Sequence, residues 1–182
     1  MKTAVLTCAS LALLGLFLSG CSTTPESADD RIAMTAKVQD AIDRARTADS
    51  GLAEFFEKSV GYAVFPTVGK GAIGVGGAYG KGQLYENGRL VGYCTLTQAT
   101  IGLALGGQAY TEFIFFETTE ALERFKSGNF AFAAQASAVA LKSGAAANAK
   151  YENGAAVFTM GEAGLMYEAS VGGQKFTYEP IL

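Results

Sequence analysis

Residues 61–94 read Gly61-Tyr-Ala-Val-Phe-Pro-Thr-Val-Gly-Lys70-Gly-Ala-Ile-Gly-Val-Gly-Gly-Ala-Tyr-Gly80-Lys-Gly-Gln-Leu-Tyr-Glu-Asn-Gly-Arg-Leu90-Val-Gly-Tyr-Cys94. Ten of the chain's 23 glycines fall in this stretch, with Val, Ile, Tyr and Phe between them. Glycine at this density opposes a helix, whereas β-branched and aromatic residues between glycines favour twisted, closely packed strands. The stretch therefore predicts a β-sheet.

Three glycine-containing pairs predict where strands turn. Asn87-Gly88 stands between two strand-like runs and is the strongest short signal for a two-residue type I′ hairpin. Asn153-Gly154 predicts a second hairpin, between strands at about 147–152 and 155–160. Gly172-Gly173 predicts a third, between residues 164–170 and 174–178.

The glycines also match the spacing of a dinucleotide-binding loop, Gly69-x-Gly71-x-x-Gly74. That loop must open a helix, whose N-terminus holds the pyrophosphate. The residues that follow, Val75-Gly-Gly-Ala-Tyr-Gly80, do not favour a helix, and no acidic residue stands about 20 positions on. Nucleotide binding is therefore not expected.

Apolar residues at helical spacing predict two helices before the glycine-dense stretch. Ser27 and Asp30 mark the first start, and Asp49 or Ser50 the second. The apolar positions are Met34, Val38, Ala41, Ile42 and Ala45, then Leu52, Phe55 and Phe56. An apolar stripe of this kind favours packing on the sheet. The alternative is that one of the two helices lies in a membrane interface.

The remaining chain alternates strands with one further helix. Residues 100–110 and 112–117 have the pattern of two strands, and Thr118-Thr119 is expected to cap a helix over residues 120–126 that Gly128 ends. Residues 130–141 are ambiguous, because alanine favours helix and the aromatic alternation favours strand; we expect strand. Together these elements predict an α+β fold: a curved antiparallel β-sheet, sandwich or partial barrel with two or three short helices packed on it.

The first residues have the pattern of a secretory signal. A basic start is followed by an apolar run over residues 4–18, too short for a permanent membrane span. The run ends in Leu18-Ser19-Gly20-Cys21, which resembles the lipobox of bacterial lipoproteins. The resemblance implies cleavage before Cys21 and attachment of diacylglycerol and a fatty acid such as palmitate to it. We expect a lipoprotein signal peptide at 1–20, the acylated Cys21 with a flexible tether at 21–28, and one domain at 29–182.

Composition narrows the chemistry of this domain. The 182-residue chain has a net charge of −3 and no histidine, and its pI near 5.0 argues against a nucleic-acid partner. Without histidine, the usual nucleophile–base pairs and most zinc sites are missing. Cys94 has no partner once Cys21 is acylated, so we interpret it as a small core residue rather than a reactive thiol. We expect no enzyme activity, no cofactor and no metal.

Several motifs resemble the SYLF domain family. They are Val64-Phe-Pro-Thr-Val-Gly-Lys-Gly, Gly74-Val-Gly-Gly-Ala-Tyr-Gly-Lys-Gly, Val91-Gly-Tyr, Thr111-Glu-Phe-Ile-Phe-Phe, Glu120-Ala-Leu-Glu-Arg-Phe and Gly164-Leu-Met-Tyr-Glu-Ala-Ser. They cover roughly residues 50–180 in the family's order. Family members include bacterial lipoproteins and modules of eukaryotic membrane-traffic and actin-regulating proteins. The resemblance implies lipid binding, known for phosphoinositides in the eukaryotic branch.

One segment is locally basic. Between residues 58 and 89 there are four cations, Lys58, Lys70, Lys81 and Arg89, against the single acid Glu86. Lys70 also occupies the lysine of the family's Val-Phe-Pro-x-x-x-Lys-x-Gly pattern. These cations are candidates for binding anionic lipid headgroups. The alternative is that they are scattered surface or edge-strand charges.

The sequence thus predicts a lipid-anchored envelope protein whose domain binds phospholipid, with anionic lipid favoured, or another amphiphile. The alternative is a structural or scaffolding lipoprotein that acts through a protein partner in the cell envelope. Ser22 replaces the aspartate that retains enterobacterial lipoproteins at the inner membrane, so we expect an outer-membrane position facing the periplasm.

The anchor is directly testable. Cys21→Ser removes the acyl acceptor and leaves the signal sequence intact, so metabolic labelling with a radioactive fatty acid should mark only the wild type. Label that persists in Cys21→Ser would contradict the lipobox interpretation.

Overall fold

The structure is a computed structural model that describes residues 23–73, 75–101, 106–132, 137–161 and 169–181. It contains the helices α1 (Ala28–Ala48), α2 (Leu52–Lys58) and α3 (Thr119–Lys126), with a short 3-10 helix η1 (Ala146–Asn148). The strands are β1 (Gly61–Ile73), β2 (Val75–Glu86), β3 (Arg89–Ile101), β4 (Gly106–Phe116), β5 (Ser137–Ala140), β6 (Ala155–Gly161), β7 (Ala169–Ser170) and β8 (Gln174–Pro180). The expected α+β class is confirmed.

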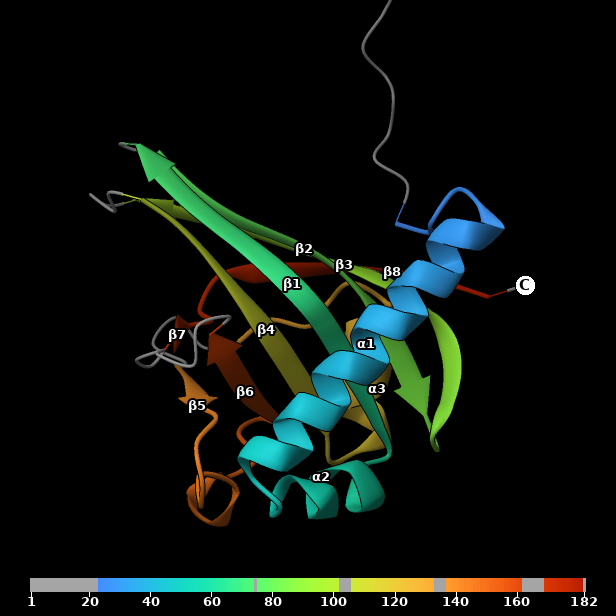
Figure 1. The fold of residues 1–182 in the computed structure, drawn as a ribbon, viewed down its shortest axis with the longest axis vertical. Coiled ribbons are helices and arrows are strands. Elements are labelled where there is room, and N and C mark those ends of the chain that lie inside the picture. Colours follow the sequence, from blue (N-terminus) through green and yellow to red (C-terminus); the bar gives the residue numbers. More distant parts are fainter. Residues whose placement is uncertain (1–22, 74, 102–105, 133–136, 162–168, 182) are drawn as a thin grey trace, which may run out of the picture.

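The described strands form one open sheet in the order β7-β5-β6-β4-β1-β2-β3-β8 (Figure 1). Its centre is a set of long antiparallel pairs, β4 with β1, β1 with β2 and β2 with β3. One pair departs from the antiparallel expectation, because β5 runs parallel to β6. The sheet is therefore mixed.

Two of the three expected turns are present. Asn87 and Gly88 have φ values of 50° and 74°, as a type I′ turn requires. Asn153 and Gly154 also turn with positive φ, but η1 and a single bridge from Glu152 to Ala155 precede β6 in place of a strand. The hairpin around Gly172-Gly173 is wrong, since β7 pairs with β5 and β8 pairs with β3 at the other edge.

The sheet is strongly curved. In a flat sheet, β4 and β8 would be four strand spacings apart, about 19 Å at roughly 4.8 Å per strand. The side chain of Gln174 in β8 nevertheless donates a 2.9 Å hydrogen bond to Glu112 in β4. The rings of Phe65 in β1 and Phe176 in β8 also lie 6.0 Å apart. These contacts confirm the curvature expected from the glycine-dense sequence and define a concave face.

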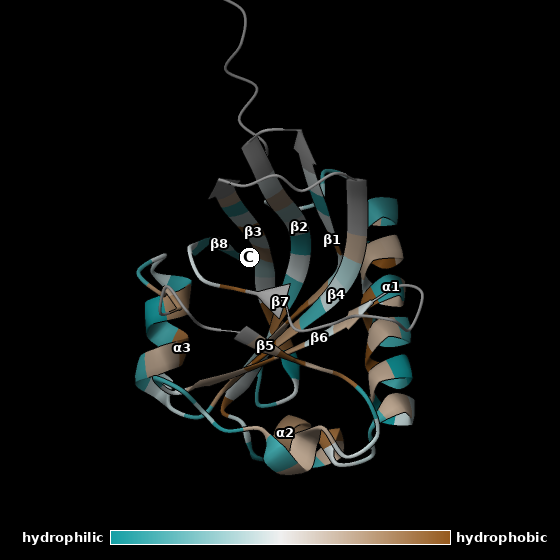
Figure 2. Ribbon diagram, turned by 90° about the vertical axis from the view of Figure 1, so that its left-hand side faces the viewer, coloured by the Kyte–Doolittle hydropathy of each residue, from teal (hydrophilic) through white to brown (hydrophobic). Residues whose placement is uncertain are grey.

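Helices cover both faces of this sheet (Figure 2). α1 and α2 pack on the convex face, where Val38, Ile42 and Leu52 share a core with Phe113 and Phe115. α3 lies on the concave face, and its Leu122 and Phe125 share the second core with residues of β1, β3 and β8. Packing on the sheet, the first of the two interpretations, is therefore observed for both N-terminal helices.

The helix ends follow the capping signals in part. The side chain of Ser27 accepts from the Asp30 amide, and that of Thr118 accepts from the Ala121 amide. α2 begins after Gly51 without a side-chain cap. The Asp49 carboxylate instead accepts from the amides of Gly51 and Ala146, at 3.0 and 2.7 Å. α1, with 21 residues, is longer than the short helices expected.

Two strand predictions change in extent. Of the strand expected over residues 100–110, residues 100–101 end β3 and residues 102–105 lie outside the described chain. The rest is continuous with the strand expected over residues 112–117, and together they form β4. Of residues 130–141, only β5 (Ser137–Ala140) is a strand, and residues 133–136 lie outside the described chain. Phe130 and Phe132 precede the strand and pack their rings on Phe176.

One glycine in β2 is needed because the backbones approach too closely for a side chain. A Cβ at Gly82 would clash with the Val64 carbonyl oxygen and stand 2.8 Å from the Phe65 ring, whereas a Cβ at Gly71 would meet nothing within 4 Å. Gly82→Ala should therefore lower the free energy of unfolding by about 1–3 kcal/mol, as overpacking does.

Gly71→Ala is the matched control and should leave stability unchanged or raise it by up to about 1 kcal/mol, because alanine restricts the unfolded chain. Urea denaturation midpoints measure both. Equal midpoints for the two variants would show that β1 and β2 do not pack as described.

Candidate functional site

The four candidate lipid-binding cations do not form one patch. Lys58 ends α2 and is ion-paired with Glu54. Arg89 is exposed just after the turn at Asn87-Gly88. Both lie near the end of the sheet where β1 begins, because Glu86 pairs with Gly61 on one side and with Arg89 on the other.

Lys70 and Lys81 lie farther along the strands and on opposite faces. Lys70 is two residues beyond Val68 of the concave core and pairs with Ala78 of the same core. Lys81 is two residues before Gln83, whose amide donates to Thr35 of α1 on the convex side. Side chains alternate between faces along a strand, so the sheet separates these two lysines.

Strand pairing brings residues that are distant in the sequence to the level of Gly69, the neighbour of Lys70. Gly69 pairs with Tyr79, Tyr79 with Thr97, and Thr97 with Lys175. Tyr79 and Lys175 therefore lie next to the level of Lys70, but on the opposite face of the sheet, which is the face of Lys81. Tyr79 is 43% exposed and Lys175 is exposed. The sequence did not indicate Lys175, because it lies 105 residues from Lys70 and the partner of β8 was wrongly predicted.

The segment between the predicted lipidation site and α1 is docked on β8. Thr23 is buried, and its hydroxyl lies 3.1 Å from that of Thr177. The Thr24 amide and hydroxyl both donate to Glu179, the amide at 2.9 Å, and these bonds lower the pKa of that carboxyl. Residues 23 and 24, which were expected to belong to a flexible tether, are therefore bonded to the domain. Cys21 itself lies outside the described residues.

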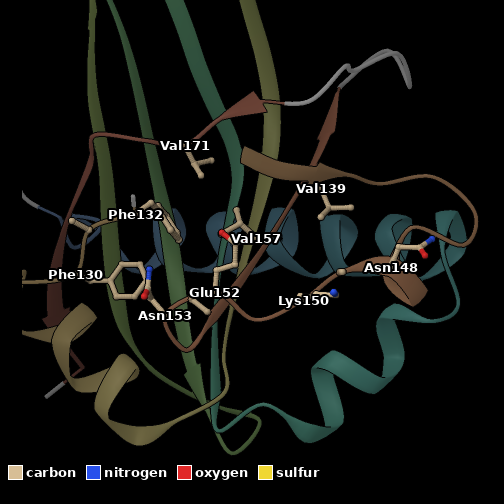
Figure 3. Close-up of a pocket in the computed structure, with 12 residues that line it drawn as sticks. Phe130, Phe132, Val139, Asn148, Lys150, Glu152, Asn153, Val157 and Val171 are labelled. Carbon is tan, nitrogen blue, oxygen red and sulfur yellow. The ribbon is translucent and has the colours of Figure 1, made fainter. Parts of the chain in front are cut away.

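A pocket of about 190 Å³ opens where the chain after α3 meets η1 and β6 (Figure 3). Phe130, Phe132, Val157 and Val171 form its apolar part, and Asn148, Lys150, Glu152 and Asn153 supply polar groups. Pockets that enclose a ligand usually measure about 300–1,000 Å³. The pocket thus fits a small amphiphilic group rather than a whole phospholipid.

The concave core contains one buried acid. Glu112 is fully buried, and burial raises its pKa to about 8, against hydrogen bonds from Gln174 and Tyr110 that favour the ionised form. Its Oε1 has no hydrogen-bond partner in the described structure. Burial also raises the pKa of the Tyr110 hydroxyl beside it. Glu112 is therefore a neutral carboxylic acid at pH 7 that links β4 to β8.

The other groups considered for chemistry have structural roles. Cys94 is a free, fully buried core residue, and burial raises the pKa of its thiol, as expected for a core cysteine.

The described residues contain no group of three or more side chains able to hold a metal ion. They also contain no helix with the length and apolar character needed to cross a membrane.

Family comparison confirms the resemblance seen in the motifs. Residues 97–180 match the family model Ysc84, described as a Las17-binding protein actin regulator. The matched part of the chain runs from within β3 to the end of β8 and is similar to the Ysc84 (SYLF) domain. The glycine-dense stretch precedes the matched residues.

A relative of known name extends the similarity. Beta cell expansion factor A from Aeromonas veronii is 28% identical to this chain over 156 residues, which are 84% of this chain. The chain covers 59% of the length of that relative.

The buried carboxyl predicts a specific pH dependence. The pKa of Glu112 is higher in the folded chain (about 8) than in the unfolded chain (about 4.3 for glutamate). Its protonated form therefore contributes stability that is fully present below about pH 4 and is lost as the pH rises through about 8.

Glu112→Gln keeps the shape and the neutral form, so it should remove this loss. Between pH 5 and 8, the unfolding free energy of wild type should fall relative to Glu112→Gln by at most about 1.4 kcal/mol per pH unit. Parallel stability curves from urea denaturation would contradict the raised pKa.

Proposed function

We propose that this chain is a lipid-anchored envelope protein whose domain binds anionic phospholipid at its surface and has no catalytic role. The observation that carries the proposal is the distribution of charge along the long strands. No charged residue occurs from Gly71 to Gly80 or from Leu90 to Thr111, and Lys70 and Lys81 flank the first of these runs. An uncharged sheet end bordered by cations suits a surface of acyl chains and phosphates.

Surface binding is better supported than enclosure of a lipid. The pocket in Figure 3 has a volume of about 190 Å³, below the range usual for an enclosed ligand. The buried Glu112 offers a neutral carboxyl that is already bonded to Gln174. Similarity to the Ysc84 (SYLF) family supports a lipid-binding domain, and the lipobox-like Leu18-Ser19-Gly20-Cys21 supports an acyl anchor.

A protein partner is the second candidate function. It is favoured by the description of the matched family, which names Las17 binding and actin regulation. In this chain, the corresponding role would be binding of a protein partner as a scaffold in the cell envelope. The two candidates differ in one respect: only the first requires affinity of the isolated domain for protein-free vesicles.

Vesicle flotation tests the proposal with residues 22–182, which retain every described element and lack the acylation site. Binding should rise with the fraction of phosphatidylglycerol in phosphatidylcholine vesicles and fall as salt screens the lysines. Lys70→Gln should weaken binding about fivefold, because one lysine near an anionic surface contributes about 1 kcal/mol.

Lys58→Gln is the matched control, since Lys58 is paired with Glu54 near the opposite end of β1. It should bind vesicles as the wild type does. If the domain floats with neither anionic nor neutral vesicles, surface lipid binding is excluded and the scaffolding function becomes the better candidate.

A further inference from the structure

The chain contains one tetrapeptide twice, each time at a tight turn. Tyr85-Glu-Asn-Gly88 spans the end of β2 and the turn to β3, and Tyr151-Glu-Asn-Gly154 leads into β6. The asparagine and glycine have φ values of 50° and 74° in the first copy and 54° and 81° in the second. The two Asn-Gly pairs therefore share their sequence and nearly share their φ angles, so any difference in their reactivity arises from the surrounding structure.

Asparagine before glycine is prone to deamidation, because glycine has no side chain to hinder its own backbone nitrogen. That nitrogen attacks Cγ of the asparagine, and Nδ2 leaves as ammonia with the proton of the glycine amide. The product is a five-membered succinimide ring. Water then opens the ring: breaking the bond from Cγ to nitrogen gives aspartate, and breaking the bond from the backbone carbonyl carbon to nitrogen gives isoaspartate. Water is the only co-reactant, and nothing is oxidised or reduced.

Ring closure requires the peptide plane between asparagine and glycine to rotate. The glycine nitrogen and the asparagine Cβ must lie on the same side of the Cα–C bond before a five-membered ring can form. In a type I′ turn, ψ of the first central residue is about 30°, which places the nitrogen away from Cβ. Contacts that hold this peptide plane in the turn therefore slow deamidation, and a plane without such contacts reacts faster.

In the second copy, the peptide plane is held by its neighbours. The Arg124 guanidinium of α3 donates a 2.9 Å hydrogen bond to the backbone carbonyl oxygen of Asn153. The amide of Glu117, just after β4, donates a 2.9 Å hydrogen bond to the carbonyl oxygen of Gly154. Gly154 also lies against α3, since a Cβ added there would stand 3.0 Å from Cβ of Ala121. Rotation of this plane breaks the bond to Arg124 and disturbs the packing on α3.

In the first copy, the corresponding plane is open to solvent. Asn87 and Gly88 are both exposed, and a Cβ added at Gly88 would meet nothing within 4 Å. Within the described part of the chain, no hydrogen bond reaches the carbonyl oxygen of either residue. The amide of Asn87 donates a 3.3 Å bond to Val60, but this amide precedes the plane that has to rotate. The plane between Asn87 and Gly88 can therefore turn without displacing a neighbour.

We propose that Asn87 is a site of spontaneous deamidation in the folded protein, and that Asn153 is protected by its contacts with α3 and with the residue after β4. The Gly88 nitrogen displaces ammonia from the Asn87 side chain, and water converts the succinimide to aspartate or isoaspartate. The reaction needs no enzyme and is not reversed by water. The modified fraction at Asn87 therefore increases with the time since a chain was synthesised.

The modification changes the turn between β2 and β3. Isoaspartate lengthens the backbone of the turn by one atom and leaves the former backbone carboxyl as a free carboxylate. A two-residue type I′ turn has no place for an additional backbone atom, so the closing pair of Glu86 and Arg89 is strained. Glu86 also accepts a 2.8 Å hydrogen bond from Lys126 of α3. Modified chains therefore gain a negative charge and hold this turn less firmly against α3.

Peptide mass spectrometry of the aged protein tests the proposal. The full-length protein is incubated in mild detergent at physiological temperature and mildly alkaline pH, and samples are digested at intervals. Trypsin separates the two copies, because it cuts at Arg89 and Lys150 between them. Asn87 should convert about tenfold faster than Asn153, the rate ratio that corresponds to breaking about one more hydrogen bond on the way to the ring. A sample digested without incubation gives the background.

Two matched controls separate structure from sequence. In concentrated urea both copies lose their contacts and keep the same tetrapeptide, so their rates should become comparable. Arg124→Met keeps the length of the side chain and removes its hydrogen-bond donors. In the folded protein it should raise the rate at Asn153 severalfold and leave the rate at Asn87 unchanged. The comparison in urea uses the wild type, so it remains decisive if Arg124→Met does not fold.

Three results would overturn the inference. The first is a rate at Asn153 in the folded protein that equals or exceeds the rate at Asn87. The second is the same ratio of rates in urea as in the folded protein, which would assign the difference to sequence. The third is conversion of Asn87 in urea with none in the folded protein, which would mean that the turn itself holds the peptide plane.

Discussion

The hydrogen bond from Gln174 to Glu112 is the contact on which the shape of the sheet depends. It joins β8 to β4 across the concave face, a distance that a flat sheet cannot close. Around it, rings of β1, β8 and α3 fill the concave core, and Phe125 lies 5.0 Å from Phe176. Burial favours the neutral form of Glu112 in this arrangement, because an ionised carboxylate would lose its hydration there. Curvature and protonation are therefore coupled at one side chain.

The features that the sequence predicted correctly depend on neighbours along the chain. The turn at Asn87-Gly88 needs two residues that tolerate positive φ, and the caps at Ser27 and Thr118 need one oxygen near a free amide. Each signal is complete within a few residues. The apolar run after Glu112 also sufficed to predict a strand, although residues on either side of Glu112 were expected to form two strands and both belong to β4.

The features that could not be predicted depend on contacts between distant segments. The parallel pairing of β5 with β6 and the placement of β8 beside β3 are set by packing on the curved sheet. Local turn residues suggested a hairpin at Gly172-Gly173 that the fold does not make. The same limit applies to the candidate site. Of four cations close in sequence, Lys58 and Arg89 lie near one end of the sheet and Lys70 and Lys81 lie farther along it on opposite faces. Lys175 comes near the level of Lys70 only through the register of four strands.

The bonds of Thr23 and Thr24 to β8 bear on how far the domain can travel. A lipoprotein with a long unstructured leader samples a wide volume above its membrane, since the reach of a flexible chain grows with its length. Here the chain is bonded two residues after Cys21, so an acylated form would have almost no reach. Such a form could contact a partner only within about one domain length of the membrane, so the partner would have to come to the bilayer surface.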